Sequence, residues 1–150
     1  MTQSLTNLLY HIVFSTKERE PMITPEIEAR LNAYLGGLIR DREGIALEIN
    51  GMADHVHLLV KLTQKIAIAN VMRDLKAISS GWVHDQFRGH RGFAWQHGYA
   101  AFSVSESAVA DVRQYVRGQK EHHRTVTFQE ELLRLLREQR IEFEEEYLWR

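Results

Sequence analysis

Two histidines separated by one residue are the sharpest chemical feature of this 150-residue sequence. His55 and His57 open the segment 55–62, in which residue types alternate as is typical of a β-strand. Residues i and i+2 of a strand point to one face, with Cα atoms about 6.5–7 Å apart. Two imidazoles at this spacing can converge on one divalent ion and leave positions for a third protein ligand, water and substrate oxygens. The alternative is a chance pair, but both histidines lie opposite the aliphatic face of the strand, where a packing role is hard to assign.

A tyrosine and a glutamine four residues apart are the second feature. Tyr115 and Gln119 occupy positions i and i+4 of a helix expected over about 107–123, so both project from one face. A tyrosine hydroxyl can attack phosphorus, although forming the phenolate at pH 7 costs roughly 4 kcal/mol. A metal that polarises the phosphate lowers that demand, and the amide oxygen of Gln119 could be a further ligand of the same metal. The alternative is a boundary tyrosine beside a solvated glutamine.

The elements that must position these residues follow a recognisable order. Hydrophobic periodicity predicts strands over 8–14, 45–50, 55–62 and 99–104, and helices over 24–42, 67–87, 107–123 and 128–137. The first six elements in chain order form the ferredoxin-like split βαβ pattern. We therefore expect an α+β fold with an antiparallel four-stranded sheet, helices on one face and an extra C-terminal helix. This topology hosts many functions and decides none of them.

Composition excludes several classes of protein. Without cysteine, the chain has no disulfide framework, thiolate zinc site or cysteine nucleophile. No apolar run approaches the ~18 residues that span a bilayer, and no secretory signal is readable, so we expect a cytoplasmic protein with no membrane partner. A net charge of −1 argues against binding polyanions over the whole surface. Residues 70–124 carry eight Lys and Arg against five Asp and Glu, whereas 128–150 carry four against seven, which allows local nucleic-acid binding.

Four segments together resemble the HUH single-tyrosine transposases, the TnpA-type enzymes of minimal insertion sequences and their REP-associated relatives. The segments are YHIVFSTK (10–17), ADHVHLLV (53–60), WQHGYAAFSVS (95–105) and QYVRGQ (114–119). They occur in the expected order, and both the H-x-H pair and the Y-x-x-x-Q motif are intact. The resemblance implies a transposase domain over 1–125, followed by a C-terminal helix and acidic tail over 126–150.

The resemblance also implies roles for the two motifs. His55 and His57 match the pair that binds a divalent ion, Mg²⁺ or Mn²⁺, Gln119 matches the third ligand, and Tyr115 matches the nucleophile. Attack on a phosphodiester of single-stranded DNA forms a 5′-phosphotyrosine and frees a 3′-OH, and a second strand's 3′-OH later reseals the link without ATP. The expected partner is single-stranded DNA with hairpins. Insertion-sequence members are homodimers that share active sites between subunits, whereas REP-associated relatives can be monomeric. The sequence itself does not decide between them, and the resemblance leads us to expect a homodimer in which active sites can be shared between subunits.

Cations and one aromatic residue are the candidate DNA contacts. Single strands are held by cations that track phosphates and by aromatic rings that stack on bases. The candidates are Lys17, Arg73, Lys76, Arg88, Arg91 and Trp95. For Trp95, a role as a core anchor is the competing interpretation.

Two further histidines lie close to the motifs in the predicted elements, and two other functions fit the same residues. His11, on the first predicted strand, is a candidate partner behind the metal ligands. His122 returns to nearly the helix face of Tyr115 and could approach the metal or the scissile phosphate, but we expect a solvated histidine at a helix end. One rival function is a catalytically silent protein that binds hairpin or single-stranded DNA, and the other is a metal phosphodiesterase that uses activated water.

Overall fold

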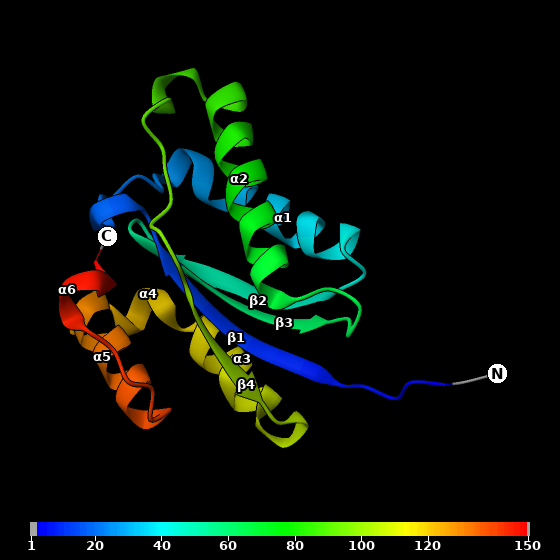
Figure 1. Cartoon of the computed structure of the whole chain (residues 1–150). Coiled ribbons are helices and arrows are strands. Elements are labelled where there is room, and N and C mark those ends of the chain that lie inside the picture. Colours follow the sequence, from blue (N-terminus) through cyan, green and yellow to red (C-terminus); the bar gives the residue numbers. More distant parts are fainter. Residues whose placement is uncertain (1–2, 150) are drawn as a thin grey trace.

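Four antiparallel strands form the sheet on which the molecule is built (Figure 1). The computed structural model describes residues 3–149. The strands are β1 (Leu8–Ser15), β2 (Ile45–Met52), β3 (His55–Leu62) and β4 (Ala100–Val104), in the order β2-β3-β1-β4. This order and the antiparallel pairing confirm the ferredoxin-like α+β prediction. In the register, His57 of β3 lies opposite Val13 of β1, so the histidine strand is held on both sides by neighbours.

The larger core lies between the sheet and two helices, α1 (Pro25–Asp41) and α2 (Ile68–Gln86). Ile12 and Phe14 of β1 and Leu58 of β3 point into it and are fully buried. Because side chains alternate across a strand, the intervening residues of β1 and β3 point to the opposite face. Pro25 opens α1 as expected, but Thr24 makes no side-chain capping hydrogen bond. Short 3₁₀ turns follow β1 (Lys17–Arg19) and α2 (Arg88–His90).

The opposite face of the sheet is covered by helices from the last third of the chain, whereas the sequence predicted helices on one face (Figure 1). A 3₁₀ turn (Glu106–Ala108) leads into α3 (Val109–Arg117) and α4 (Gln119–His122), which are followed by α5 (Phe128–Glu138) and α6 (Glu145–Leu148). The single helix expected over 107–123 is thus interrupted at Gly118, where φ is −85° and ψ is 13°. The interruption divides the Tyr115 and Gln119 positions between two helices.

Helix α5 packs against the sheet through a second, smaller core. Its apolar stripe contacts Val13 and Phe102 and consists of Phe128, Leu132, Leu135 and Leu136. The capping box predicted at its start is present, since the Glu130 amide donates to the Thr127 hydroxyl at 3.2 Å. The C-terminal segment expected over 126–150 therefore covers the sheet face that carries the two histidines.

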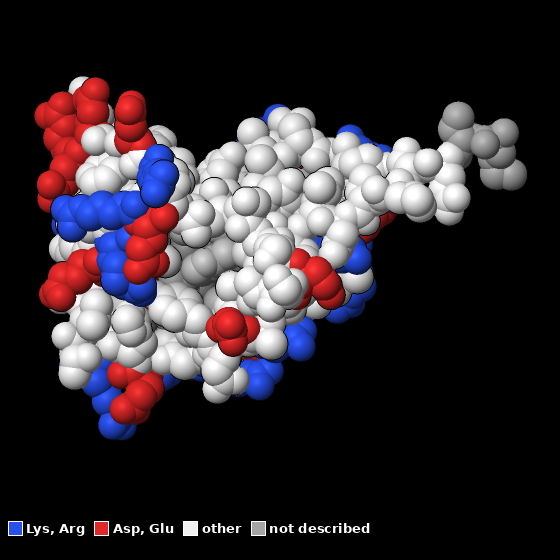
Figure 2. Space-filling model, turned by 90° about the horizontal axis from the view of Figure 1, so that it is seen from below, with Lys and Arg blue, Asp and Glu red and all other residues white. Residues whose placement is uncertain are grey.

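The surface on this side of the molecule carries its charges unevenly. Figure 2 shows acidic and basic residues intermixed over the C-terminal helices, and no broad field of Lys and Arg across the rest of the visible face. Among residues 3–149, no helix is long and apolar enough to cross a membrane.

Candidate functional site

Strand β3 places both predicted histidine ligands in the interior. His55 and His57 are completely buried on the sheet face that α3, α4 and α5 cover. Their ring centroids lie 5.1 Å apart. Because β1 and β2 pair with β3 along its length, the two imidazoles sit on a rigid element.

The helices after β4 bring the second motif to the same place. Gln119, at the start of α4, is fully buried, and its Oε1 lies 3.1 Å from His55 Nε2. Tyr115, near the end of α3, is half-buried, and its ring packs 5.8 Å from that of His57. Its hydroxyl accepts a hydrogen bond from Arg134 at 3.0 Å. All four residues of the two sequence motifs therefore meet within one chain.

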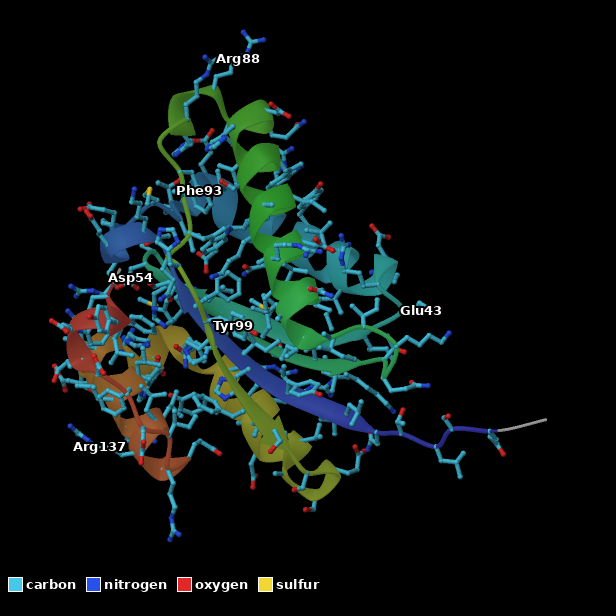
Figure 3. All side chains as sticks on the ribbon, in the orientation of Figure 1. Glu43, Asp54, Arg88, Phe93, Tyr99 and Arg137 are labelled. Atoms are coloured by element: carbon cyan, nitrogen blue, oxygen red, sulfur yellow. The ribbon has the colours of Figure 1, made fainter. Side chains whose placement is uncertain are left out.

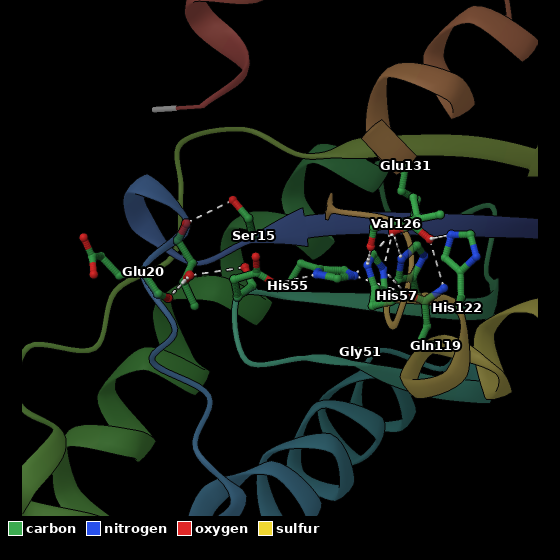
Figure 4. Close-up of polar contacts among 12 residues, drawn as sticks. Ser15, Glu20, Gly51, His55, His57, Gln119, His122, Val126 and Glu131 are labelled. Atoms are coloured by element: carbon green, nitrogen blue, oxygen red, sulfur yellow. Dashed lines mark hydrogen bonds and ion pairs between the residues drawn. The ribbon is translucent and has the colours of Figure 1, made fainter. Parts of the chain in front are cut away.

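A carboxylate from α5 lies at the centre of this cluster. Glu131 is fully buried, and its Oε1 lies 2.9 Å from His57 Nε2 and 3.4 Å from His55 Nε2 (Figure 4). Its Oε2 accepts hydrogen bonds from the Tyr115 hydroxyl and from the Gln119 amide. Glu131 thus joins the histidine pair to the tyrosine.

Two histidines at the C-terminal end of α4 complete the cluster. His123 Nε2 lies 2.9 Å from Gln119 Oε1 and 3.1 Å from Glu131 Oε1. His122 is more exposed, and its Nε2 lies 3.3 Å from Glu131 Oε2 while its ring packs against Tyr115. His122 therefore borders the site as its helical spacing from the tyrosine suggested.

Sequence reasoning missed Glu131 and His123, although one signal was available. Phe128, Glu131, Leu132, Leu135 and Leu136 follow helical spacing, so Glu131 is the only charged member of an otherwise apolar stripe. A carboxylate at such a position is rarely buried unless it is paired. For His123, no comparable pattern exists in the sequence.

Each inner imidazole is oriented by a partner on its other nitrogen. His55 Nδ1 lies 2.7 Å from Asp54 Oδ1, and His123 Nδ1 donates to the Val126 carbonyl at 2.7 Å. His57 Nδ1 lies 2.8 Å from Nε2 of His11, which is itself 5% exposed. The partner role predicted for His11 therefore has its contact. This arrangement directs all three Nε2 atoms toward the cluster, as outer partners do for metal-binding histidines.

Burial and neighbouring charges strongly shift the pKa values of the residues in this cluster. Burial lowers the pKa of His55, but its hydrogen bonds to Asp54 and Glu131 outweigh that effect and raise the pKa to about 9. Burial lowers the pKa of His57 to about 4, although the hydrogen bond and negative charge of Glu131 act to raise it. Burial raises the pKa of Glu131, and the surrounding histidines reverse this and hold the pKa far below its usual range.

The nucleophile candidate is held in its neutral form. Burial raises the pKa of Tyr115 well above its ordinary value, and the adjacent Glu131 carboxylate raises it further. Arg134 acts in the opposite direction but does not outweigh them. An additional positive charge near the tyrosine oxygen is therefore needed before the phenolate becomes accessible at neutral pH.

The donor atoms fit a divalent ion in type and in spacing. Nε2 of His55, His57 and His123 and one oxygen of Glu131 all lie within 4.8 Å of one another. The shorter separations among them, 2.9–3.4 Å, agree with those of ligands that share one ion. Ligands at about 2.1–2.2 Å from an ion are about 3.0–3.6 Å apart. The oxygen of Gln119 extends the set to five donors.

The candidate DNA contacts are distributed over two regions. Lys17 is exposed just after the end of β1 where Ser15 pairs with His55. Arg73 is exposed on α2, beside Asp74. Arg88 and Arg91 are exposed beyond the end of α2, and Figure 3 shows Arg88 at the far tip of the molecule.

Two of the candidates have structural contacts instead. Trp95 is 8% exposed, packs edge-on against Phe14 and donates its indole N–H to Ser79 at 2.9 Å. Its side chain is part of the core, so the expectation that it stacks on a base does not fit this placement. Lys76 donates to the carbonyls of Gln96 and Gly98, which ties the 88–98 loop to α2, and burial lowers its pKa to about 8.

Comparisons with known proteins agree on one family. The family described as "Transposase IS200 like" matches residues 4–119. The transposase for insertion sequence element IS200 of Salmonella typhimurium is 30% identical over 121 residues, which are 77% of this chain and 78% of the relative. A solved Deinococcus radiodurans structure superimposes with a TM-score of 0.62 and 25% identity over 79% of this chain and 98% of its own. A REP-associated tyrosine transposase, solved with a REP hairpin bound, has a TM-score of 0.59 and 14% identity over 84% of this chain and 76% of its own, which indicates a shared fold.

Proposed function

Because the chain belongs to the IS200-like transposase family and is a transposase, we propose that it cuts and rejoins single-stranded DNA with Tyr115 as nucleophile. His55, His57 and Gln119 would hold a divalent ion, Mg²⁺ or Mn²⁺. When bound, this ion polarises the scissile phosphate and stabilises developing negative charge. One observation carries the proposal. The tyrosine hydroxyl bonds the same buried carboxylate that lies against both histidines of the H-x-H pair.

The bonds and protons of the reaction can be assigned to named atoms. The Tyr115 hydroxyl oxygen bonds to phosphorus while the bond from phosphorus to the 3′ oxygen breaks. This leaves a 5′-phosphotyrosine, and the released 3′ oxygen takes up a proton. In the ground state the tyrosine proton is directed at Glu131 Oε2. Because the histidines make Glu131 a poor base, the proton has to pass onward to the leaving oxygen or to water.

Arg134 has a positioning role in this scheme. Its guanidinium donates to the Tyr115 hydroxyl at 3.0 Å and lies 5.7 Å from the ring centroid. A fixed positive charge beside the phenol oxygen favours its ionised form. Arg134 thus keeps the hydroxyl oriented and opposes the effect of the carboxylate on its pKa.

The DNA substrate that we propose is a single strand bearing a hairpin. The REP-associated transposase with the same fold was solved with a REP hairpin bound. In this chain the exposed cations Lys17, Arg73, Arg88 and Arg91 are the proposed phosphate contacts. We place the protein in the cytoplasm, where such DNA is available to it.

The site is proposed to work within a single chain. Gln119 and Tyr115 reach the His55 and Glu131 side chains of their own chain. A homodimer with shared sites is the alternative. Mixing two inactive variants distinguishes these two arrangements of the site. Tyr115→Phe and His57→Ala should stay inactive together if the site is complete in one chain. Regained cleavage would indicate that subunits exchange their tyrosine helices.

The experiment that tests the function detects the covalent intermediate. Full-length protein is incubated with hairpin-bearing single-stranded DNA and Mn²⁺, digested, and searched by mass spectrometry for a nucleotide on the Tyr115 peptide. The adduct should require the ion and disappear in Tyr115→Phe. Tyr34→Phe is the matched control, because Tyr34 stacks on Trp82 of α2, on the other side of the sheet.

The rival functions predict different results in the same experiment. Continued phosphodiester cleavage by Tyr115→Phe would establish a metal phosphodiesterase that uses activated water. Tight hairpin binding without any adduct, including with DNA that flanks the protein's own gene, would establish a silent binding protein.

A further inference from the structure

We propose that His123 and Glu131 are also metal ligands, and that the resulting set of three imidazoles, one carboxylate and one amide oxygen selects a first-row transition ion over Mg²⁺. The proposal rests on the proposed function in one respect: the ion is the one that His55 and His57 hold. It adds two ligands from the turn and helix that follow residue 119, where the family match ends.

The burial of Glu131 is the first argument. A carboxylate with 0% exposure is costly unless it is paired or coordinates a metal. Its stripe neighbours on α5 are apolar, so nothing else on that helix face satisfies it. Instead, its Oε1 is surrounded by nitrogens of three different imidazoles at 2.9–3.4 Å.

The orientation of the imidazoles is the second argument. His123 Nδ1 carries its proton toward the Val126 carbonyl, so the neutral ring presents a lone pair at Nε2. Asp54 would hold His55 in the same tautomer once that ring is neutral. The neutral His123 ring directs a nitrogen lone pair at the Glu131 carboxylate oxygen 3.1 Å away, which is a favourable contact only with a cation between the two atoms. A divalent ion supplies that charge without protonating the rings.

The chemistry of the donors decides which ion is preferred. Mg²⁺ favours oxygen ligands and retains several waters. Imidazole suits Zn²⁺, Fe²⁺, Ni²⁺ and Cu²⁺ best, and Mn²⁺, which is softer than Mg²⁺, accepts it more readily than Mg²⁺ does. Without His123 and Glu131, the site has two imidazoles and an amide oxygen and leaves room for water. With them, nitrogen supplies three of five protein ligands. We therefore expect this chain to bind Mn²⁺ or Zn²⁺ in preference to Mg²⁺.

The test measures metal binding by the full chain without DNA. Mn²⁺ affinity is determined by electron paramagnetic resonance, and Mg²⁺ is then titrated as competitor. Glu131→Gln and His123→Gln should each weaken Mn²⁺ binding by at least about tenfold, the lower end of the loss seen even for outer-shell partners. Mg²⁺ should need a large excess to displace Mn²⁺ from the wild-type protein. Matched controls are Glu142→Gln and His97→Gln, two exposed positions that should leave the affinity unchanged.

Circular dichroism of the metal-free variants shows whether each is folded, and the two substitutions test the proposal independently. His57→Ala separates this inference from the proposed function. If His57→Ala loses the ion while Glu131→Gln and His123→Gln bind it as the wild type does, only the two added ligands are refuted. If His57→Ala also binds normally, the metal role of the histidine pair itself is refuted. Displacement of Mn²⁺ by an equal concentration of Mg²⁺ would refute the selectivity.

Discussion

His11 lies behind the proposed metal ligand His57, and its replacement by phenylalanine tests how strongly metal binding depends on this contact. The ring of His11 stacks on His57 at 5.1 Å and contacts Phe102 and Tyr115 edge-on. Phenylalanine keeps an aromatic ring among these neighbours but removes the contact between His11 Nε2 and His57 Nδ1 at 2.8 Å. When His57 binds an ion through Nε2, its Nδ1–H must donate to a partner, and in His11→Phe that partner is gone.

The expected loss follows from the burial of His57. A fully buried N–H without a partner costs about 1–3 kcal/mol, and His57 is 0% exposed. Every 1.4 kcal/mol is about tenfold in affinity, so His11→Phe should weaken Mn²⁺ binding by about 10–100-fold. Loss of an outer partner of a metal-binding histidine has effects of the same size.

The assay is Mn²⁺ titration of folded, full-length protein by calorimetry. His11→Gln, which restores a hydrogen-bonding group, should recover part of the lost affinity. His84→Phe is the control, because His84 Nε2 donates to the Phe93 carbonyl in the core on the other side of the sheet. It should lower stability without changing Mn²⁺ affinity. Equal affinities for His11→Phe and wild type, with both folded, would refute the reasoning.

Further predictions concern pH, a tight hairpin and the loop after α2. Burial lowers the pKa of His57 to about 4 and of His11 to about 3, so their stabilising contribution is complete above pH 6.5 and is lost as the pH falls toward those values. His55, whose pKa is raised to about 9, offsets part of this loss, and urea unfolding in EDTA should show a net loss on the order of 3 kcal/mol between pH 7 and pH 5. Gly51→Ala should destabilise the protein by about 3 kcal/mol or more in the same assay, because the alanine Cβ would lie 2.2 Å from the carbonyl oxygen of His55. Gly81→Ala, in open space on α2, should stabilise by about 0.5–1 kcal/mol. Lys76→Met should lower protection of the 88–98 loop in hydrogen exchange while leaving the salt dependence of DNA binding unchanged, since this lysine bonds backbone carbonyls.

Three of these predictions have a distinct outcome that contradicts them. Metal-free stability that is flat between pH 5 and pH 7 would mean that His11 and His57 are not held neutral. A Gly51→Ala protein as stable as the wild type would mean that the hairpin backbone shifts to accommodate the added methyl group without loss of stability. A reduced salt slope in Lys76→Met would identify this lysine as a phosphate contact after all.

Features encoded by local periodicity were predictable from the sequence. The strand 55–62 was predicted with its observed bounds, because alternation of residue types reports a sheet face directly. Tyr115 and Gln119 were placed on one side of a helical region for the same reason, although the interruption at Gly118 was not foreseen. The family resemblance then predicted that the two motifs form one site. The periodicity of each segment alone does not indicate this.

Features that depend on how distant segments dock were not predictable. The burial of Glu131 results from α5 packing on the sheet, and no residue near it in the chain indicates which side chains its carboxylate contacts. The sequence left Trp95 open between stacking on a base and anchoring the core, because it lies in a glycine-rich loop; that loop returns to pair with Thr16 and carries the indole into the core. Local sequence reports an element's faces, whereas the choice of neighbour is a property of the whole fold.

The sequence separations within the cluster have a consequence for folding order. The contacts from His11 to His57, His55 to Gln119 and His57 to Glu131 span 46, 64 and 74 residues. Contacts of such separation form only after the intervening chain is ordered. The sheet must therefore close before α5 can dock, and an ion that needs the complete cluster binds late. Such an ion slows unfolding much more than it accelerates folding. A growing chain also lacks the assembled cluster until residue 131 has been synthesised, so the proposed chemistry is withheld until α5 has been made.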